Sequence, residues 1–212
     1  MKRIIFVLLL IFLNFLSYPQ GAVDYYEKGR EAFFNENYND AIYSFKKAIE
    51  INKNYVEAIL ELSRVYYYIE NYDYAFEYIN KALKISPVND DLLLFSAKID
   101  TNLKKYDNAE EKYKKILKNN PLNLDAKNGL ANLYLITKRY ILAKKSLEEI
   151  LRTDKTNFTA ISLLSIYYET FDKNISEKYY IMNIENNSLN PESYFLYSLF
   201  NFRNGDIRKA VD

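Results

Sequence analysis

The chain of 212 residues contains no cysteine and no histidine, and these two absences exclude most catalytic and metal-binding arrangements. Without cysteine there is no disulfide, no thiolate nucleophile and no zinc site built on sulfur. Without histidine, the commonest general base and metal ligand is missing. The sequence therefore predicts no catalytic residue, no metal site and no cofactor, because an enzyme would have to work with Asp, Glu, Lys or Tyr alone.

Glycine and proline are scarce, with 4 residues each, and the charges nearly cancel. Few helix breakers favour long helices over a turn-rich all-β fold. Lys plus Arg number 29 and Asp plus Glu 28, so a formal net charge of +1 provides no field to attract nucleic acid or an anionic membrane. Hydrophobic residues make up 49% of the chain, which is ordinary for a globular protein. We expect an all-α protein that does not bind nucleic acid.

The N-terminus has the layout of a secretory signal peptide. Lys2 and Arg3 precede a largely apolar run over residues 4–16, and a polar stretch with proline and glycine follows. The run is shorter than the roughly 20 residues that a helix needs to cross a bilayer. We predict export, with residues 1–21 as a signal peptide or as an uncleaved anchor. The protein would then be periplasmic or anchored on the outer side of the cytoplasmic membrane, and would meet the membrane only through an uncleaved segment.

Two ladders of residues recur along the chain with a step of 34 residues. One pairs tyrosine with an alanine three residues later, at Tyr38 with Ala41, Tyr72 with Ala75, Tyr106 with Ala109, and Tyr140 with Ala143. The other holds only small side chains, at Gly29, Ser63, Ala97, Ala131 and Ser165, with Ser198 one residue early. A fixed period of this length indicates an array of stacked repeats.

The repeats resemble tetratricopeptide repeats (TPRs), which are helix-turn-helix units of 34 residues. The second unit fits the family pattern best, with Ile59, Leu62, Ser63, Tyr66, Tyr72, Ala75, Ile79, Ala82 and Pro87. The resemblance covers residues 22–212 and gives the units 22–55, 56–89, 90–123, 124–157, 158–190 and a partial unit 191–212. It implies an all-α fold, an α-solenoid of about five and a half repeats that follows the N-terminal signal segment.

The residue types at these positions have physical reasons. Small side chains are expected where the two helices of a unit cross closely, because a larger one would push the helices apart. Asn39, Asp73 and Asp107 fall where each second helix starts, and we expect each to cap it by accepting a hydrogen bond from a free backbone N–H. In the fifth unit Asn174 and Glu177 replace the tyrosine and alanine, which predicts a slightly displaced second helix.

The end of the chain carries an apolar helix. Pro191 suits the first turn of a new helix, and the residues after it form an apolar flank over 194–202. A solenoid normally ends in a helix with a polar outer face. We therefore expect the sequence to be a fragment of a longer array. Alternatively, this helix is the last cap of the array, or it docks on a partner.

The resemblance also implies a binding surface, because the first helices of TPR units line a concave groove that holds a peptide. Carried over position by position, the partner-binding residues are Tyr26, Arg30, Phe33 and Phe34 in the first unit, Leu60, Arg64, Tyr67 and Tyr68 in the second, and Leu94 and Lys98 in the third. Aromatic residues and arginine are typical interface anchors. The alternative is that many of the 22 tyrosines serve only to pack the scaffold and that the following units bury part of this set.

The best-known TPR specificity is absent. The family's clamp for the C-terminal carboxylate of chaperone tails uses Lys and Asn, then Asn, then Lys and Arg. Here those places hold Tyr26 and Arg30, then Glu61, then Asp91 and Phe95. This departure argues against a cytosolic chaperone adaptor and fits an exported protein.

The sequence thus predicts a protein–protein interaction scaffold or assembly factor that binds a peptide or helix of an unidentified partner. It predicts no small-molecule substrate. By the resemblance, assembly of a bacterial envelope machine or of periplasmic filaments is a suitable task. Two alternatives stay open: a self-assembling structural component of the envelope, and the N-terminal TPR fragment of a longer protein with another functional domain.

Overall fold

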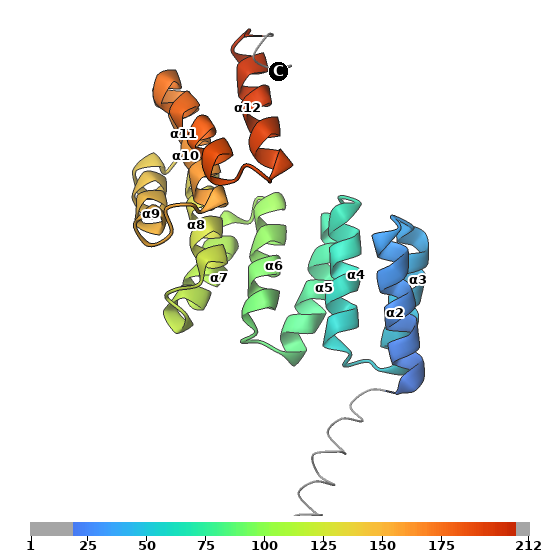
Figure 1. The fold of residues 1–212 in the computed structure, drawn as a ribbon. Helices are drawn as coiled ribbons and strands as arrows, with labels where there is room; N and C mark the ends of the chain where they lie inside the picture. The colour runs from blue at the N-terminus through green and yellow to red at the C-terminus, as the bar shows by residue number, and fades with distance from the viewer. Residues whose placement is uncertain (1–18, 207–212) are drawn as a thin grey trace, which may run out of the picture. The chain divides into compact units, whose positions relative to one another are not determined.

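The computed structural model describes residues 19–206, which form eleven α-helices and contain no β-strand (Figure 1). The helices are α2 (Gln20–Phe34), α3 (Tyr38–Ile51), α4 (Val56–Tyr68), α5 (Tyr72–Ile85), α6 (Asp90–Asn102), α7 (Tyr106–Asn119), α8 (Leu124–Ile136), α9 (Tyr140–Thr153), α10 (Phe158–Phe171), α11 (Lys173–Asn186) and α12 (Pro191–Arg203). The predicted all-α array of helix-turn-helix repeats is confirmed. The signal segment predicted for residues 1–21 falls almost wholly outside the described residues. Within residues 19–206, no helix is both long enough and apolar enough to cross a membrane.

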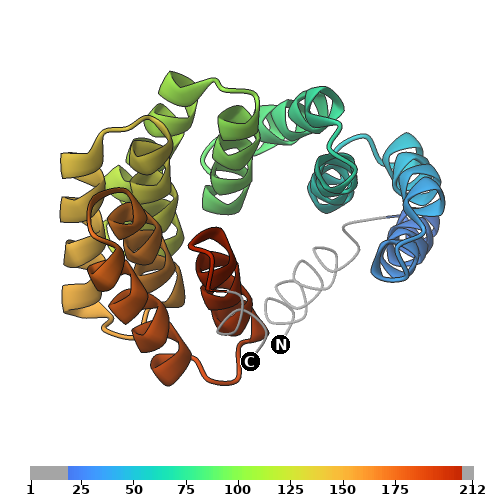
Figure 2. The same ribbon diagram turned by 90° about the horizontal axis from the view of Figure 1, so that it is seen from above.

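The chain divides into two compact units, residues 1–105 and 106–212. In the first unit α2 pairs with α3 and α4 with α5, and α6 packs on α5. The first helices α2 and α4 also touch each other, so α2 and α4 form one layer and α3 and α5 a second layer (Figures 1 and 2). In the second unit α8 pairs with α9 and α10 with α11, while α7 packs on α8 and α12 on α11.

Within each compact unit, the small-residue ladders lie where the helices of a pair cross, as predicted. The ladder residues Ala41, Ser63, Ala75, Ala97, Ala109, Ala131, Ala143 and Ser165 all have 0% exposure. The hydroxyl of Ser63 donates a hydrogen bond of 2.7 Å to the carbonyl of Ala75, so the side chain of one helix reaches the backbone of the next. A bulkier side chain at either position would separate the two helices.

In the first repeat this crossing is made by Gly29 and Phe45. Phe45 has 0% exposure, and a Cβ placed on Gly29 would lie 2.7 Å from two carbons of the Phe45 ring. That distance is well inside van der Waals contact. The phenylalanine ring therefore occupies the space that a serine or alanine side chain fills at the same position in the other repeats.

We predict that Gly29→Ala lowers the stability of the full-length protein by about 1 kcal/mol. Overpacking a core costs roughly 1–3 kcal/mol, and the better helix propensity of alanine returns about 1 kcal/mol. The urea midpoint of unfolding measures the change. In a Phe45→Leu background, where the ring is gone, Gly29→Ala should instead raise the midpoint. An equal loss in both backgrounds would show that the contact with Phe45 is not the cause.

The first four repeats share one unusual turn between their two helices. Glu36, Glu70, Lys104 and Lys138 have φ values of 58° or 59° and recur with the 34-residue period. In the second repeat the N–H of Glu70 donates to the Tyr67 carbonyl and the next N–H donates to the Tyr66 carbonyl. This is the Schellman arrangement that most often uses glycine. A residue with a side chain pays roughly 1 kcal/mol or more for the left-handed conformation, so the helix pairs hold these turns against local preference.

The fifth repeat has a shorter turn. α10 ends at Phe171 and α11 begins at Lys173, so Asp172 alone joins the two helices. The Asp172 carboxylate accepts hydrogen bonds from two backbone N–H groups in the first turn of α11. The left-handed residue of the earlier repeats is therefore missing here, and the repeat is one residue shorter.

The lost residue produces the displacement predicted for the second helix of this repeat. Ser176, rather than the residue after it, takes the crossing position and is fully buried. Its hydroxyl donates a hydrogen bond of 2.8 Å to the Ser165 carbonyl. The same loss explains why Ser198 comes one residue early in the small-residue ladder.

The prediction for the helix caps was wrong. Each second helix begins at its ladder tyrosine, so Asn39, Asp73 and Asp107 lie inside the first turn. In the second repeat the cap is Asn71, whose side-chain oxygen accepts a hydrogen bond from the N–H of Tyr74. The carboxylates of Asp73 and Asp107 still favour the helix by placing negative charge near its positive end.

The clearer caps belong to the first helices of the repeats. An asparagine stands directly before each of four first helices, and its side chain accepts a hydrogen bond from a backbone N–H of the first turn. These residues are Asn89, Asn123, Asn157 and Asn190. Asn190 is followed by Pro191 at the start of α12, as predicted for that proline.

Candidate partner-binding surface

The ten predicted partner-binding residues all lie on α2, α4 and α6, the first helices within the first unit. Side chains from consecutive repeats meet there in a regular way. Counted from the first residue of each repeat (22, 56 and 90), the ninth residue of one repeat lies near the sixth residue of the next. The charge of Arg30 lowers the pKa of the Glu61 carboxyl, and the Arg64 guanidinium lies 5.8 Å from the centre of the Phe95 ring. Arg64 also forms a salt bridge of 2.9 Å with Glu61.

A second regular contact joins the twelfth position of one repeat to the thirteenth of the next. The rings of Phe33 and Tyr68 meet edge to face with their centres 5.2 Å apart. One repeat further on, the amide of Asn102 donates a hydrogen bond of 2.9 Å to the Tyr67 hydroxyl. The Tyr67 ring also meets Phe95 edge to face at 5.4 Å. These contacts connect the three helices into one continuous surface, which we call the first-helix face.

Glu61 lies at the centre of this face and was missed as a site residue. Its side chain is only 17% exposed, and burial raises the pKa of its carboxyl although the guanidiniums of Arg64 and Arg30 lower it. The carboxylate can pair with the arginines or accept hydrogen bonds from a bound chain. The sequence could have indicated Glu61 as a site residue, because it stands at a position where the chaperone-tail clamp of the family has a polar side chain that contacts the ligand.

The predicted residues differ in how much surface they offer. Tyr68 is 65% exposed and Phe34 is 88% exposed. Leu60 instead packs against the hydrophobic core, as does Tyr26, whose ring centre lies 5.1 Å from that of Tyr55. Burial raises the pKa of the Tyr26 hydroxyl. Phe33 and Tyr67 are likewise partly buried against this core, so these four residues support the scaffold as well as contributing surface.

The remaining predicted residues lie on α6 or at the edge of the face. Lys98 is exposed and Leu94 is partly exposed. Arg30 lies 5.8 Å from the centre of the Tyr26 ring and 3.5 Å from a carboxylate oxygen of Glu27, with more than half of its side chain exposed. The structure thus brings most of the predicted aromatic and arginine residues into contact with one another, while the exposed Phe34 lines a recess on α2 beside Arg30.

A family model described as tetratricopeptide repeat matches residues 26–90 and 102–157, which is more than half of the chain. The chain belongs to the tetratricopeptide repeat family. No curated protein sequence matches it significantly.

Solved structures of other TPR proteins share the fold. PilW, a widely conserved type IV pilus biogenesis factor, is 16% identical with a TM-score of 0.73, over 91% of this chain and 90% of PilW. TTC0263, a TPR protein of Thermus thermophilus, is 15% identical with a TM-score of 0.71, over 85% of this chain and 99% of TTC0263. The first TPR of Spaghetti (RPAP3), bound to the HSP90 peptide SRMEEVD, is 19% identical with a TM-score of 0.54, over 58% of this chain and 98% of that one. At these identities the likeness establishes the fold alone.

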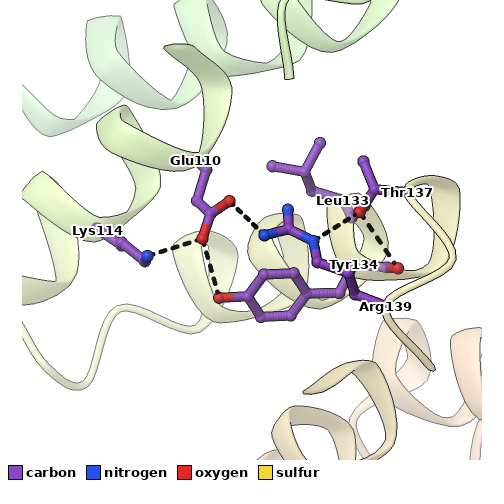
Figure 3. Close-up of polar contacts among 6 residues, drawn as sticks. All are labelled: Glu110, Lys114, Leu133, Tyr134, Thr137 and Arg139. Atoms are coloured by element: carbon purple, nitrogen blue, oxygen red, sulfur yellow. Dashed lines mark hydrogen bonds and ion pairs between the residues drawn. The ribbon is translucent and has the colours of Figure 1, made fainter. Parts of the chain in front are cut away.

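In the second compact unit, Glu110 on α7 is the centre of a cluster of ionisable and polar side chains. Its carboxylate is 2.7 Å from both Lys114 and Arg139, and it accepts a hydrogen bond from Tyr134 at 3.4 Å (Figure 3). The Arg139 guanidinium also donates to the Thr137 hydroxyl at 3.0 Å. The cluster joins α7, the second helix of one repeat, to α8 of the next repeat and to the turn that leads into α9.

The electrostatics of this cluster indicate a structural role. Burial raises the pKa of Glu110, but the hydrogen bonds and charges of Lys114 and Arg139 together outweigh burial, so the net pKa is lowered. The pKa of Lys114 is raised mainly by its hydrogen bond to Glu110. A carboxylate held ionised and fully paired is a poor general acid or base at neutral pH. Within residues 19–206, no three Asp or Glu side chains are grouped so that they could hold a metal ion.

We predict that Glu110→Gln destabilises the protein by about 1–2 kcal/mol at pH 7, because charged hydrogen bonds are lost. A carboxyl whose pKa is lowered on folding stabilises the fold above its unfolded pKa of about 4.3 and loses this effect as the pH falls through the folded value. The gap in urea midpoint between wild type and variant should therefore narrow from pH 7 to about pH 3.5. Glu111→Gln, on the exposed side of α7, is the control and should change little at either pH. A gap independent of pH would contradict the assignment.

Proposed function

We propose that this TPR protein is an interaction scaffold that binds a peptide or helix of a partner protein on the first-helix face. The observation that carries the proposal is the regular joining of aromatic and arginine side chains from three successive first helices. Aromatic and arginine residues dominate the energetics of protein interfaces. Here they also sit on rigid helices that are already packed, so binding costs little ordering of the receptor.

The chemistry of the face suggests what it binds. Tyr68 offers exposed ring surface, while Arg30 and Arg64 offer donors on either side of the Glu61 carboxylate. A partner segment with apolar side chains for the rings and polar groups for the charged positions fits this surface. The HSP90 peptide bound by the TPR of Spaghetti shows that the fold accommodates a peptide, although the residues of the carboxylate clamp are not present in this chain.

The proposed setting is the bacterial envelope. The basic residues and apolar run at the N-terminus favour export, to the periplasm or to the outer side of the cytoplasmic membrane. PilW, which shares the fold, is a factor of type IV pilus biogenesis, so assembly of an envelope structure suits a protein of this kind. A non-catalytic role is part of the proposal, because the sequence contains no histidine or cysteine and the Glu110 carboxylate is paired with Lys114 and Arg139.

The test compares wild type with an Arg64→Ala, Tyr68→Ala variant of the full-length protein. Both side chains are partly or largely exposed, so the variant should keep its thermal stability. Each protein is used to capture partners from an envelope extract of the source cells, and mass spectrometry identifies them. We expect at least one partner to be retained by wild type and reduced about tenfold or more by the variant, as for the loss of interface anchors.

A matched control removes the same kinds of side chain from the other layer of the first unit. Tyr43 is 58% exposed and lies under the ammonium of Lys47 on α3. The Tyr43→Ala, Lys47→Ala variant should capture the same partners as wild type. If both variants lose the partner equally, or if neither does, the first-helix face is not the binding surface.

A second candidate function is self-assembly through α12, favoured by the exposed rings on that helix. Tyr194 is 49%, Phe195 64% and Phe202 66% exposed. We predict that, if this helix mediates assembly, light scattering will give a mass above that of the monomer, and that Phe195→Glu will restore the monomer. Ile141→Glu, at an 86% exposed site on α9, is the control and should leave the mass unchanged. A monomeric wild type would rule out this candidate.

A further inference from the structure

The first compact unit has a recessed surface on the layer opposite the first-helix face. A cavity of about 660 Å³ lies between α3 and α5, with part of α4 beneath it. Four lysines line it, Lys46 and Lys53 from the α3 side and Lys81 and Lys84 from α5. We call it the lysine pocket. Its volume lies within the range of roughly 300–1,000 Å³ that is typical of binding sites.

The charge of the lysine pocket is strongly positive in a chain that is nearly neutral. Among its lining residues the one acid is Glu50, and that carboxylate already pairs at 2.7 Å with Lys47, which does not line the pocket. Lys81 pairs with Glu77 at 2.6 Å. Lys46, Lys53 and Lys84 form no ion pair with any acidic side chain in residues 19–206. The pocket therefore holds positive charge that the described protein does not balance.

The lysines are fixed against aromatic rings on one side. The ammonium of Lys46 lies near Tyr66, whose ring stacks between those of Tyr74 and Tyr78. A hydrogen bond to Tyr66 raises the pKa of Lys46, so this lysine stays charged. The Lys81 ammonium lies 4.4 Å from the centre of the Tyr78 ring. These contacts hold two of the four cations in place before any ligand binds.

The floor of the lysine pocket is apolar. Ile59 of α4 is almost completely buried beneath it, and Ile49 and Ile85 flank the opening, with Ile85 39% exposed. A ligand must therefore offer both negative charge and aliphatic surface.

We propose that the lysine pocket binds an acidic peptide segment of a protein partner. An aliphatic side chain of that segment rests on the isoleucine floor, and neighbouring carboxylates pair with the rim lysines. Lys46 lies on α3, Lys53 follows the end of that helix, and Lys81 and Lys84 lie on α5, so the positive charge is distributed around the recess rather than gathered at one point. A peptide with several carboxylates matches that spread. The site is distinct from the first-helix face, and this inference does not depend on the function proposed for that face.

The test uses full-length protein and a fluorescein-labelled probe peptide, Glu-Glu-Ile-Glu-Glu-Leu, with fluorescence anisotropy at low salt. Lys53→Gln with Lys84→Gln should weaken binding by about fivefold or more, since each exposed charge contributes roughly 0.5 kcal/mol. Both lysines are exposed, so thermal unfolding should match wild type. Lys104→Gln with Lys118→Gln makes the same change in net charge elsewhere and should bind the probe as wild type does.

Two altered peptides test the two halves of the proposed ligand. Replacing the glutamates by glutamine, or the isoleucine and leucine by serine, should each weaken binding by about fivefold or more. Inorganic phosphate at millimolar concentration should compete poorly, and phosphatidylglycerol vesicles should bind no better to wild type than to the pocket variant. The Arg64→Ala, Tyr68→Ala variant should bind the probe normally, which separates this site from the first-helix face.

The opposite results would overturn the inference. If the pocket variant and the control variant lose the same affinity, the effect is bulk charge. If the glutamine peptide binds equally well, the site does not recognise carboxylates. If phosphate displaces the probe efficiently, or if vesicles bind through these lysines and the peptide does not, the ligand is a phosphate or a membrane rather than a peptide.

Discussion

The close crossing of paired helices within each compact unit is the constraint on which the rest of the structure depends. Where the ladder residues meet, the side chains are no larger than alanine or serine, and the serine hydroxyls reach the backbone of the facing helix. Such contacts fix the spacing and rotation of each pair. Because that geometry repeats every 34 residues, two positions that meet between one pair of neighbouring repeats also meet between the next pair. The regular contacts on the first-helix face follow from this rule.

The crossing also explains which local irregularities the chain tolerates. Four turns use glutamate or lysine in a left-handed conformation that favours glycine, because the helix pairs on both sides determine where the chain must turn. The fifth repeat meets the same requirement by removing the residue altogether. Asp172 then serves both helices, and Ser176 moves into the crossing position. The small residue at the crossing is preserved even though the turn is not.

The sequence predicted the helix pairs, their period and the displaced helix of the fifth repeat, because each depends on which residues are small or bulky at fixed spacing. It did not predict the left-handed turns, since Glu70 or Lys104 carries no local signal for that conformation. The asparagine caps before the first helices did carry a signal, a period of their own at Asn89, Asn123 and Asn157. The cap prediction instead used Asn39, Asp73 and Asp107, which lie one position inside the second helices.

The binding surface was predicted less completely than the fold, for a physical reason. Periodicity shows that a position lies on the first helices, but exposure depends on what the next repeat places beside it. Tyr26 and Leu60 were assigned to the surface and pack against the core, while Glu61 was missed and lies between two arginines. The lysine pocket was also missed, because its four lysines come from α3, from the turn after it and from α5, and the charge pattern of each segment looks like that of an ordinary solvated face.

A comparison of repeat junctions shows why such positions can vary in chemistry without disturbing the fold. Where Glu110 pairs with Arg139 at 2.7 Å in one junction, the equivalent residues one repeat earlier are Phe76 and Lys105, whose ammonium lies 3.6 Å from the ring centre. Equivalent junctions between consecutive repeats are thus held by an ion pair in one case and by a cation–π contact in the other. The small-residue crossing sets the geometry, and the junction needs only an attractive contact across it. Surface positions that make no contact between repeats can vary even more in residue type. A TPR scaffold can therefore present aromatic and arginine side chains on one layer and lysines on the other.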